Sequence, residues 1–494
     1  MKELSFRAAL LLMAFCTIAD IHAYDFMVDG IYYNIINNNE VHVTCRNYDD
    51  EGDYSGAITI PECVTFNNIS YIVTGIGERA FHNSYNLTNI DIPNSVSVIG
   101  RYAFYECTSL SQIIFPNSIE VLDDFSFFGC SGLSEVFIPN SVKKLGESFD
   151  YGPFAFCSGL QSVHLPDSIE KITVGTFAEC TGLKSINIPS TVTVIEESAF
   201  ENCSSLTNIE IPSKVYKIGP NALAGTAWLS NQPDGMVYAG KVAYKYKGSI
   251  PDGSSITLDN GTLGIAGAAF VTTSSSDYGY LPDDYYNGLT GISIPNTVRC
   301  IEKRAFYSCH NLREIIIPNS VTEIGERAFA SCSSLVKATI SDDVDTLMYG
   351  TFEYCKTLKD VTIGRGMKAF DNGVFYHCDA LAKVTCKATQ PPALEGQTFD
   401  KETYTNAVLC VPKESELDYM TAYGWKSFTR IVGIDVHTDA CDVNGDGVVN
   451  ISDLNNVVND ILSGKGDPSM DVNVDGSVNI SDINIIVQSI LTTN

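Results

Sequence analysis

Basic side chains are scarce in this sequence. Its 494 residues contain 31 lysines and arginines against 59 aspartates and glutamates, so the formal net charge is −28. A surface of that sign repels nucleic acid and anionic lipid at long range, and it attracts cations. The charge balance therefore argues against a nucleic-acid partner.

Histidine is also scarce, and the groupings on which many enzymes depend are missing. Six of the seven histidines lie beyond residue 23, and they are scattered singly. None has the spacing of a zinc site or a catalytic triad, and the sequence has no phosphate-cradling glycine loop and no dinucleotide-binding fingerprint. We therefore expect a non-enzymatic protein without catalytic residues.

Long apolar runs are missing as well, and the one short run lies near the N-terminus. Residues 1–23 begin with the basic Lys2 and Arg7, continue through an apolar segment at 8–19, and end in the sequence IHA. The apolar segment has about 12 residues, too few to span a bilayer core of about 30 Å. This pattern predicts a secretory signal peptide. We expect a secreted protein, extracellular or at the cell surface, with no transmembrane segment.

One motif recurs about twelve times between residues 67 and 383. Its template is I-x-I-P-x-x-V-x-x-I-G-x-x-A-F-x-x-C-x-x-L, and its period is 23 residues. The F position of the A-F element is phenylalanine in every unit but one, where it is Leu223. The units cover residues 67–89, 90–112, 113–135, 136–162, 163–185, 186–208, 209–231, 256–291, 292–314, 315–337, 338–360 and 361–383.

The template predicts a solenoid. The two isoleucines of I-x-I point to one side of a short strand, and the proline that follows ends the strand because it has no N–H group for the ladder. Later apolar residues recur every three or four positions, which suits a tight arc of short helical turns leading to the next strand. A single coil has too little core, so the coils must stack. We predict an α/β repeat fold, a solenoid of about twelve coils with β-rich caps.

Nine of the 16 cysteines share one template slot. They are Cys107, Cys130, Cys157, Cys180, Cys203, Cys309, Cys332, Cys355 and Cys378. A slot filled once per coil is interior, so cysteine acts there as a small buried apolar side chain. Parallel neighbours suit disulfide geometry poorly, and the C-x-x-C spacing of zinc sites is missing, so we expect free buried thiols. Cys386 and Cys410 lie outside the column, and a disulfide between them stays open.

Two segments interrupt the repeat, an island at 232–255 and an insertion at about 271–287. The island sequence VYAGKVAY predicts a hairpin around Ala239-Gly240. The insertion gathers four tyrosines next to carboxylates, namely Tyr278, Tyr280, Tyr285 and Tyr286. Tyrosine rings of this kind stack on sugars and bond their hydroxyls. The alternative, a loop that only packs against the flank of the solenoid, also stays open.

The middle residue of I-x-I faces out of the strand layer, so ligand contact is expected among these variable residues. In three successive coils they are Ile114, Phe137 and His164. Ile114 and Phe137 are apolar where a solvated polar residue would be the default. A contiguous exposed apolar patch marks a contact site, whereas two such residues are also easily covered by a neighbouring side chain. We favour the contact.

The tail contains the most specific chemical pattern. Residues 442–453 read DVNGDGVVNISD, and residues 471–482 read DVNVDGSVNISD. Each segment places oxygen donors at loop positions 1, 3, 5, 9 and 12, with glycine at position 6 where the backbone turns sharply. Apolar residues then follow at helical spacing. Oxygen donors in this order indicate calcium, and two copies 29 residues apart make the signal strong.

The I-P-N-S-V, I-G-x-x-A-F and C-x-x-L elements resemble the BspA-like leucine-rich repeats of bacterial surface proteins. Roughly residues 24 to 433 fit, with an N-terminal β cap at 24–66, the solenoid at 67–383 and a C-terminal cap at 384–433. The island is similar to insertions in that family, which favours a structural role for it. The resemblance implies a surface or secreted adhesin that binds host or partner macromolecules without catalysis.

After a linker at 434–440, residues 441–494 resemble a type I dockerin, a module that attaches proteins to cohesin-bearing scaffolds. The resemblance implies two calcium ions. Carried over residue by residue, it assigns the first ion to Asp442, Asn444, Asp446, the carbonyl of Val448, Asn450 through water, and Asp453. It assigns the second ion to Asp471, Asn473, Asp475, the carbonyl of Ser477, Asn479 through water, and Asp482.

The same resemblance assigns cohesin recognition to loop positions 10 and 11, which are Ile451, Ser452, Ile480 and Ser481. Two features depart from the family pattern. The usual hydroxyl pair is Ile-Ser here, and the basic residues expected late in each helix are absent. These departures concern cohesin recognition rather than calcium binding.

The sequence as a whole predicts a binding or adhesion protein. Its solenoid would bind a host or partner macromolecule or a glycan, and its calcium-loaded tail would dock to a cohesin-type partner. Two alternatives remain: a dockerin-bearing, carbohydrate-active component of a polysaccharide-degrading complex, and a structural spacer. An acidic cluster on consecutive coils would favour the carbohydrate-active alternative. The nearest acidic group, Asp342, Asp343 and Asp345, has the pattern of strand-end turn residues.

Overall fold

The computed structural model describes residues 23–494 apart from 48–51, 53, 147–150, 272–287, 435–440, 445–448, 468–469, 474–475 and 493–494. Nearly all of the expected signal peptide, the four insertion tyrosines, and Asp446, Val448 and Asp475 lie outside the described residues. The chain divides into two compact units. The first comprises the residues up to Val192 with Ser198–Glu210 and Ala222–Asn231, and the second comprises Thr193–Glu197, Ile211–Asn221 and Gln232–Asn494.

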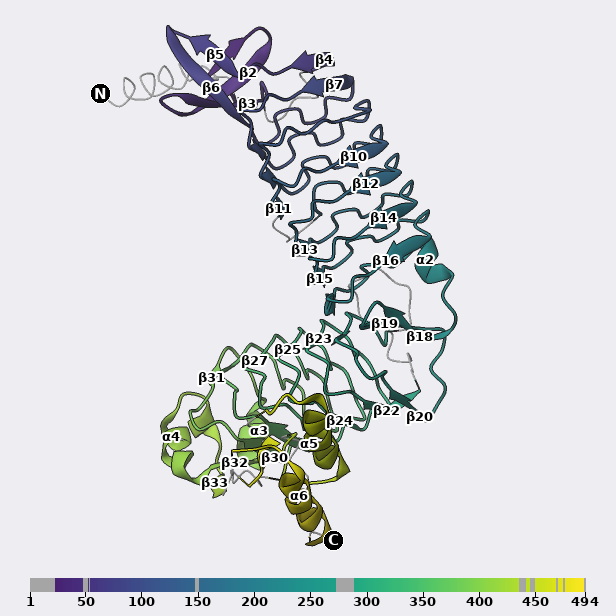
Figure 1. Ribbon diagram of the computed structural model, residues 1–494. Helices are drawn as coiled ribbons and strands as arrows, with labels where there is room; N and C mark the ends of the chain where they lie inside the picture. The colour runs from purple at the N-terminus through teal and green to yellow at the C-terminus, as the bar shows by residue number, and fades with distance from the viewer. Residues whose placement is uncertain are drawn as a thin grey trace, which may run out of the picture. The chain divides into compact units, whose positions relative to one another are not determined.

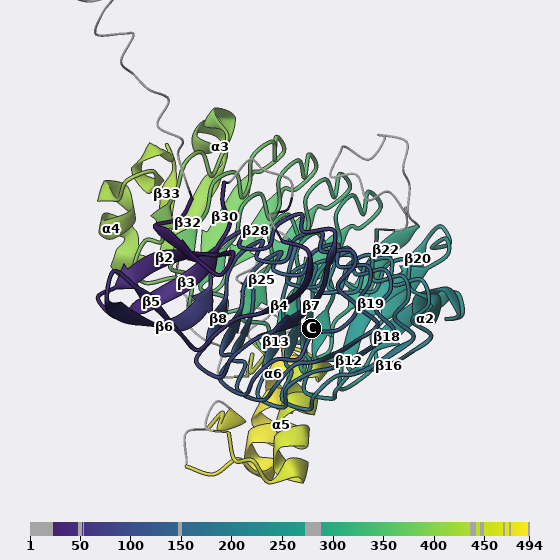
Figure 2. The ribbon, with the colours of Figure 1, turned by 90° about the horizontal axis from the view of Figure 1, so that it is seen from above.

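An eight-stranded sheet opens the first unit. Its strands are β1 (Phe26–Val28), β2 (Ile31–Asn37), β3 (Glu40–Thr44), β5 (Cys63–Phe66), β6 (Ile69–Ile76), β8 (Val98–Ile99), β9 (Val121–Leu122) and β11 (Lys144–Leu145). The pairs β1–β2, β2–β3 and β5–β6 are antiparallel. From β3 to β6 and onward through β8, β9 and β11 the pairing is parallel. Figure 2 shows the hairpin strands β2, β3, β5 and β6 together in purple.

The I-x-I segments form a second sheet in the first unit. Strands β10 (Glu135–Phe137), β12 (Ser162–His164), β14 (Ser185–Asn187) and β16 (Asn208–Glu210) are parallel and lie one above the other in Figure 1. Their register aligns equivalent template positions, for example Ile186 with Ile209. Nearer the N-terminus, β4 (Gly56–Thr59) pairs in parallel with β7 (Leu87–Asp91). The unit also contains β13 (Lys171–Ile172) and the short helix α2 (Ala227–Ser230). The predicted stacking of parallel strands is confirmed.

The arcs between strands differ from the expected short helical turns. Apart from α2, the described arcs of the first unit consist of turns. In the coil of Phe104, Tyr102 and Glu106 have positive φ angles of 57°, which break the right-handed path that a helix needs. The N–H groups of Tyr102, Phe104 and Glu106 instead donate to carbonyls of the next coil, at 3.3, 2.7 and 2.7 Å. The arc is therefore bonded to its neighbour like a strand.

A column of stacked aromatic rings runs through the interior of each unit. In the first unit the rings of Phe81, Phe104, Phe127, Phe154, Phe177 and Phe200 follow one another at 4.9 to 6.0 Å. In the second unit Phe270, Phe306, Phe329, Phe352 and Phe375 do so at 4.8 to 5.5 Å. Each cap contributes one more ring, Tyr54 against Phe81 and Phe399 against Phe375. The caps therefore continue the core of the coils.

The second unit repeats the two-sheet arrangement. Its larger sheet is β24 (Glu314–Ile316), β26 (Lys337–Thr339), β28 (Asp360–Ile363), β30 (Lys383–Cys386), β32 (Val408–Pro412) and β33 (Ile431–Ile434), all parallel. The other sheets contain β18 (Gly235–Ala239), β19 (Val242–Lys247), β21 (Gly264–Ile265), β23 (Cys300–Ile301) and β25 (Glu323–Ile324); β27 (Thr346–Leu347), β29 (Ala369–Phe370) and β31 (Ala393–Leu394); and β20 (Ser254–Thr257) with β22 (Leu289–Ser293). Strand β15 (Val194–Ile195) pairs with β17 (Lys217–Ile218).

The island is a hairpin, as the sequence predicts. Strands β18 and β19 are antiparallel around Gly240, whose φ angle is 61°. Strand β19 then pairs in parallel with β21, so the hairpin adds a strand to the solenoid sheet. The Lys245 ammonium donates to the carbonyls of Ala268 and Val271, and burial lowers the pKa of Lys245 to about 8. These contacts give the island a structural role.

The column cysteines are free and buried, as expected. Each thiol for which the structure gives a bond donates to the carbonyl of the buried phenylalanine one coil earlier, as Cys130 Sγ does to Phe104 at 3.1 Å. Burial raises the pKa of Cys157 to about 12. Cys386 and Cys410 are also free. Because Thr385, not Cys386, aligns with Cys410 between β30 and β32, the two thiols face opposite sides of the sheet.

The C-terminal cap closes the second unit with aromatic side chains. Its helical segments are α3 (Lys401–Asn406), η1 (Lys413–Ser415), α4 (Glu416–Thr421) and η2 (Trp425–Ser427). Trp425 and Tyr419 are fully buried. The Trp425 indole N–H donates to the carbonyl of Pro392 at 2.7 Å, and the Tyr419 hydroxyl donates to the carbonyl of Ala388 at 2.8 Å. Both large rings therefore bury their apolar bodies and keep a partner for their polar atoms.

Replacing Phe177 with alanine tests which face of the coil is inside. The ring is fully buried between Phe154 and Phe200, and truncations of this kind cost about 3 to 5 kcal/mol. We expect that loss of unfolding free energy in denaturant melts of the full chain. Phe137→Ala is the matched control, because that ring is 57% exposed, and it should cost about 1 kcal/mol or less. A similarly small loss for Phe177→Ala would contradict the buried column.

Candidate functional site

Two helices follow the two predicted calcium loops directly. They are α5 (Ile451–Ser463) and α6 (Ile480–Thr492). Asn450 caps the first, because its side-chain oxygen accepts the N–H of Ser452 at 2.7 Å, and Asn479 accepts the N–H of Ser481 at 2.9 Å in the second. Such caps satisfy N–H groups that a helix start leaves without a partner. Position 9 of each loop is therefore also a helix cap.

The carboxylate at loop position 12 ties each loop to its helix. Asp453 accepts the N–H of Asn444 at 3.1 Å and the N–H of Asn450 at 2.8 Å. Asp482 repeats this with Asn473 at 3.2 Å and Asn479 at 2.8 Å. Both aspartates are fully buried. Positions 3, 9 and 12 are thus held together in both loops by one side chain.

The other described loop residues fit a hard cation. Asp442, Asn444, Asp471 and Asn473 bring carboxylate or amide oxygens, and the loops contain no histidine or cysteine. The N–H of Gly476, whose φ angle is 88°, donates to Asp471 Oδ2 at 2.7 Å, which folds the second loop at position 6. Calcium takes six to eight oxygen ligands of this kind. Three further predicted ligands lie outside the described residues: Asp446, Val448 and Asp475. The predicted ligand carbonyl of Ser477 accepts a hydrogen bond from the side-chain amide of Asn479 at 2.8 Å.

A small apolar cluster joins the two loop–helix segments. Its buried members are Cys441, Val457, Val472 and Ile486. The position-8 residues Val449 and Val478 are partly buried against it, so they connect each loop to the cluster. So small a core supplies little folding energy by itself.

The predicted cohesin-reading residues lie at the starts of α5 and α6. Ile451 is 69% exposed and Ile480 is 70% exposed, although both are large and apolar. Ser481 is exposed, and Ser452 is partly buried. The duplication therefore places the same Ile-Ser pair at the surface twice, where it is accessible to a partner.

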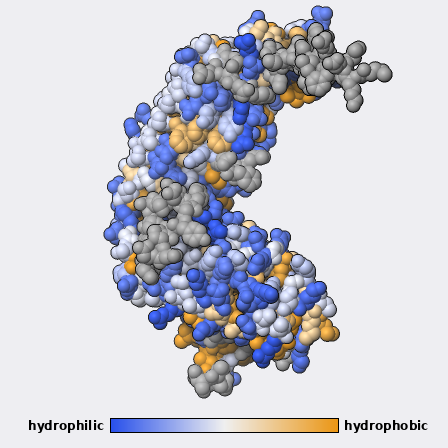
Figure 3. Space-filling view, turned by 180° about the vertical axis from the view of Figure 1, so that it is seen from behind, coloured by the Kyte–Doolittle hydropathy of each residue, from blue (hydrophilic) through white to orange (hydrophobic). Residues whose placement is uncertain are grey.

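On the solenoid, the predicted contact residues are exposed. Ile114 is 74% exposed and Phe137 is 57% exposed. Phe137 pairs with His164 between β10 and β12, and their rings stack with centroids 4.1 Å apart. His164 Nε2 also lies 3.5 Å from Glu135. Figure 3 shows the molecule from behind the view of Figure 1, with apolar patches that interrupt a mostly hydrophilic surface.

An aromatic strip on the arcs of the first unit is a feature that the sequence analysis missed. The strip comprises Tyr102, Tyr105, Phe125, Phe128, Tyr151 and Phe156. Three pairs of rings from successive coils, Tyr102–Phe125, Tyr105–Phe128 and Phe128–Phe156, have centroids 4.7 to 4.9 Å apart. Tyr151 lies 6.3 Å from Phe125, and the Arg101 guanidinium lies 5.0 Å from the Tyr102 centroid. Tyr151 and Phe156 are each 38% exposed. Part of the signal was available, because the slots two before and one after the buried phenylalanine are aromatic in the coils of Phe104 and Phe127 and become glycine, alanine, serine, asparagine or glutamate in the next four coils. Tyr151 and Phe156 lie three before and two after the buried phenylalanine of their coil.

Two of the three acidic residues considered for a carbohydrate-active site, Asp342 and Asp345, have structural partners. Asp342 accepts the main-chain N–H of Arg365 at 2.9 Å and lies 3.6 Å from its guanidinium. Asp345 lies 3.3 Å from Lys368. Both basic residues belong to the next coil, so the carboxylates tie successive coils together.

Two families match the chain. The BspA type leucine rich repeat region matches residues 62–152, 147–233 and 284–404, with six copies, and the dockerin type I domain matches residues 440–491. No curated protein matches the chain. None of the described helices has the length and apolar character that crossing a membrane requires. Leucine-rich repeat proteins are typically non-catalytic, and dockerin domains bind calcium and dock to cohesins.

Solved structures of bacterial proteins are similar to this chain. A leucine-rich repeat protein from Bacteroides ovatus is 26% identical over 73% of this chain and 94% of that chain, with a TM-score of 0.37. A leucine rich cell surface protein from Faecalibacterium prausnitzii is 24% identical over 76% of this chain and 96% of that chain, with a TM-score of 0.35. The repeat match spans more than half of the sequence. The chain belongs to the BspA-type leucine-rich repeat family and ends in a dockerin type I domain.

Proposed function

We propose that this is a secreted, non-catalytic binding protein that holds a macromolecular ligand on its solenoid and docks through its calcium-loaded tail to a cohesin-type partner. Membership in a repeat family and the dockerin domain support the two halves of this function. The observation that carries it is the exposure of large apolar side chains at two variable places, Ile114 with Phe137 on the solenoid and Ile451 with Ile480 on the tail.

The solenoid contact is proposed at Ile114, Phe137 and His164. The buried template positions serve the core in every coil, so only the outward positions are free to vary with the ligand. An exposed apolar side chain gains about 25 cal/mol for each Å² that a ligand removes from water. The Phe137–His164 stack presents a rigid, partly polar platform beside Ile114. Such a combination suits a protein or glycan surface.

The tail is proposed to bind two calcium ions through the residues of the two loops. The side chains of Asp442, Asn444 and Asp453 provide oxygen donors in the first described loop segment, and Asp471, Asn473 and Asp482 do so in the second. Bound calcium would supply positive charge to a segment whose net charge is −7 between residues 441 and 494. The carboxylates at position 12 would then hold loop, helix and ion together.

Calcium should fold the isolated 441–494 fragment. Two ions reduce its formal charge from −7 to −3, and its small core leaves it largely unfolded without them. We expect a calcium-dependent gain of helix by circular dichroism, with magnesium much less effective because it resists large flexible sites. Asp453→Ala and Asp482→Ala should each weaken the transition. Equal helicity in chelator would show that calcium is not the structural switch.

Cohesin docking should depend on the exposed isoleucines at the helix starts. With calcium present, the full chain should be captured on immobilised cohesins, and chelator should release it. The Ile451→Asp/Ile480→Asp double variant should lose about 2 kcal/mol or more of binding, about thirtyfold in Kd. Leu462→Asp is the matched control, because Leu462 is 79% exposed at the other end of α5. Capture that is unchanged in the double variant, or absent from a broad cohesin panel, would contradict this docking mode.

Ligand binding should depend on the exposed residues of the solenoid contact. We expect the full chain to bind members of a panel of glycans and matrix proteins, and Ile114→Ser and Phe137→Ser each to weaken that binding at least tenfold. Ile316→Ser changes the same template slot in the second unit, where the side chain is 41% exposed, and should leave binding unchanged. Release of reducing sugar from a polysaccharide would favour the carbohydrate-active alternative, and equal effects of all three variants would place the ligand elsewhere.

A further inference from the structure

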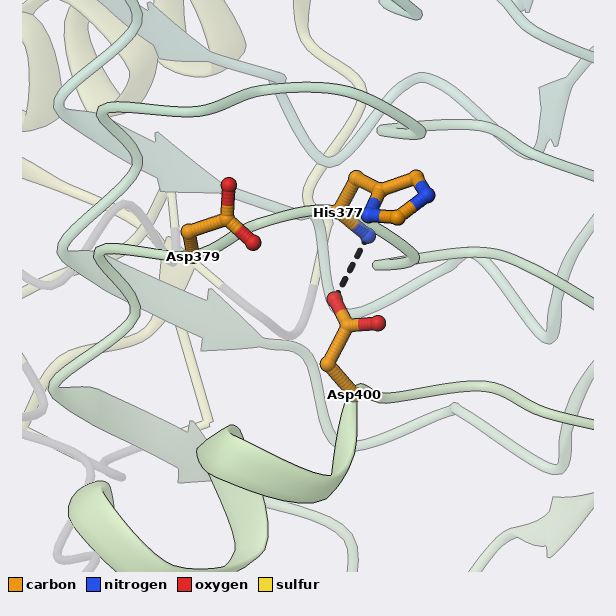
Figure 4. Close-up of side chains that lie close together, drawn as sticks. All are labelled: His377, Asp379 and Asp400. Carbon is orange, nitrogen blue, oxygen red and sulfur yellow. Dashed lines mark hydrogen bonds between the residues drawn. The ribbon is translucent and has the colours of Figure 1, made fainter.

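A histidine and two aspartates converge where the last coil meets the C-terminal cap. His377 and Asp379 lie in the arc after Phe375, and Asp400 directly follows Phe399, the next ring of the aromatic column. One ligand atom from each of the three side chains lies within 4.8 Å of the other two. Figure 4 shows the imidazole and both carboxylates around a common space. The group belongs neither to the tail loops nor to the proposed solenoid contact.

Asp400 has a structural task that explains part of this arrangement. In the preceding coils the residue two after the buried phenylalanine donates its N–H to a carbonyl of the next coil, as Tyr354 does to Tyr376 at 2.8 Å. At the end of the column the N–H of His377 donates to Asp400 Oδ2 instead, at 2.6 Å. A carboxylate has two oxygens and about four acceptor positions, so this bond leaves capacity for a further ligand.

The charge of Asp400 is poorly compensated. The residue is 8% exposed, and burial raises its pKa, with Asp379 and Glu402 adding to the effect and the N–H and ring of His377 opposing it. Burying a carboxylate among other carboxylates is costly unless a cation pairs with it. A carboxylate oxygen of the second aspartate, Asp379, lies within 4.8 Å of one on Asp400. The position therefore favours a cation.

The imidazole is already oriented. The His377 ring lies 4.0 Å from the Tyr376 ring and 4.7 Å from the Tyr354 ring, centroid to centroid. Rings packed in this way fix the direction of the nitrogen atoms and lower the entropy that a ligand would have to remove. Asp379, in contrast, is exposed and free to rotate toward a shared ligand.

We propose that His377, Asp379 and Asp400 bind one first-row divalent transition-metal ion, with zinc as the representative. One imidazole nitrogen and two carboxylate oxygens suit zinc, whereas calcium and magnesium prefer oxygen alone. Zinc bonds of about 2.0 to 2.2 Å put tetrahedral ligand atoms about 3.4 Å apart, so ligand atoms that already lie within 4.8 Å of one another need only a small approach to close the site. The ion would join the last coil to the cap, and it would stabilise the folded chain.

Zinc titration of the full mature chain tests this site. Calcium is present in excess, so that the tail loops are filled before zinc is added. We expect one zinc ion per chain by calorimetry, a rise in melting temperature, and a cobalt spectrum without thiolate charge-transfer bands. His377→Gln and Asp379→Asn should each weaken zinc binding at least tenfold. Asp379 is exposed, so its variant should fold normally.

Two controls separate this site from the others. His164→Gln removes an exposed imidazole that lies beside a single carboxylate, Glu135, and it should bind zinc like the unaltered chain. Asp453→Ala/Asp482→Ala should also keep the zinc site, whatever it does to cohesin docking. Absence of zinc binding, equal affinity in His377→Gln and Asp379→Asn, or loss of zinc with the tail variant would overturn the proposal.

Discussion

Hydrogen bonds between the main chains of successive coils stabilise each of the two units from within. Strands provide them on two sides of the coil, and alternate N–H groups of the arc provide them on the third, as Phe104 does with Ser126. Every coil must therefore follow nearly the same backbone path as its neighbour. Buried main-chain groups without partners are costly, so the 23-residue period is kept and variation is confined to outward positions and to inserted segments.

The cysteine column follows from the same requirement. The Phe104 carbonyl accepts the N–H of Cys107 within its own coil at 3.2 Å and the thiol of Cys130 from the next coil at 3.1 Å. Alanine would fill most of the slot but would leave the second bond unmade. Serine would make it with a more strongly hydrated group that is costlier to bury. Cysteine combines a small apolar body with a weak donor, and burial keeps its thiol protonated.

Sequence periodicity predicted the stacked parallel strands, the buried cysteine column, the island hairpin and the exposure of Ile114 and Phe137, because each depends on alternation or on the repeat itself. The arcs were predicted wrongly as helical turns. Spacings of three and four residues also fit turns interrupted by left-handed residues, and nothing in the identities of Tyr102 and Glu106 signals a positive φ angle. The group at His377 and Asp400 escaped notice because Asp400 lies in a cap that lacks the template.

The solenoid and the tail differ in how they obtain their folding energy, and this difference bears on the proposed function. Nearly every coil adds a fully buried ring and its main-chain bonds to a continuous core, so packing between coils is the main source of the solenoid's stability. The tail has four buried core residues, and two buried carboxylates, Asp453 and Asp482, organise its loops. Removing calcium would therefore unfold the tail and its docking surface, whereas the solenoid around Phe137 would stay folded. Attachment to a scaffold and binding of a ligand would then be independently controlled within one chain.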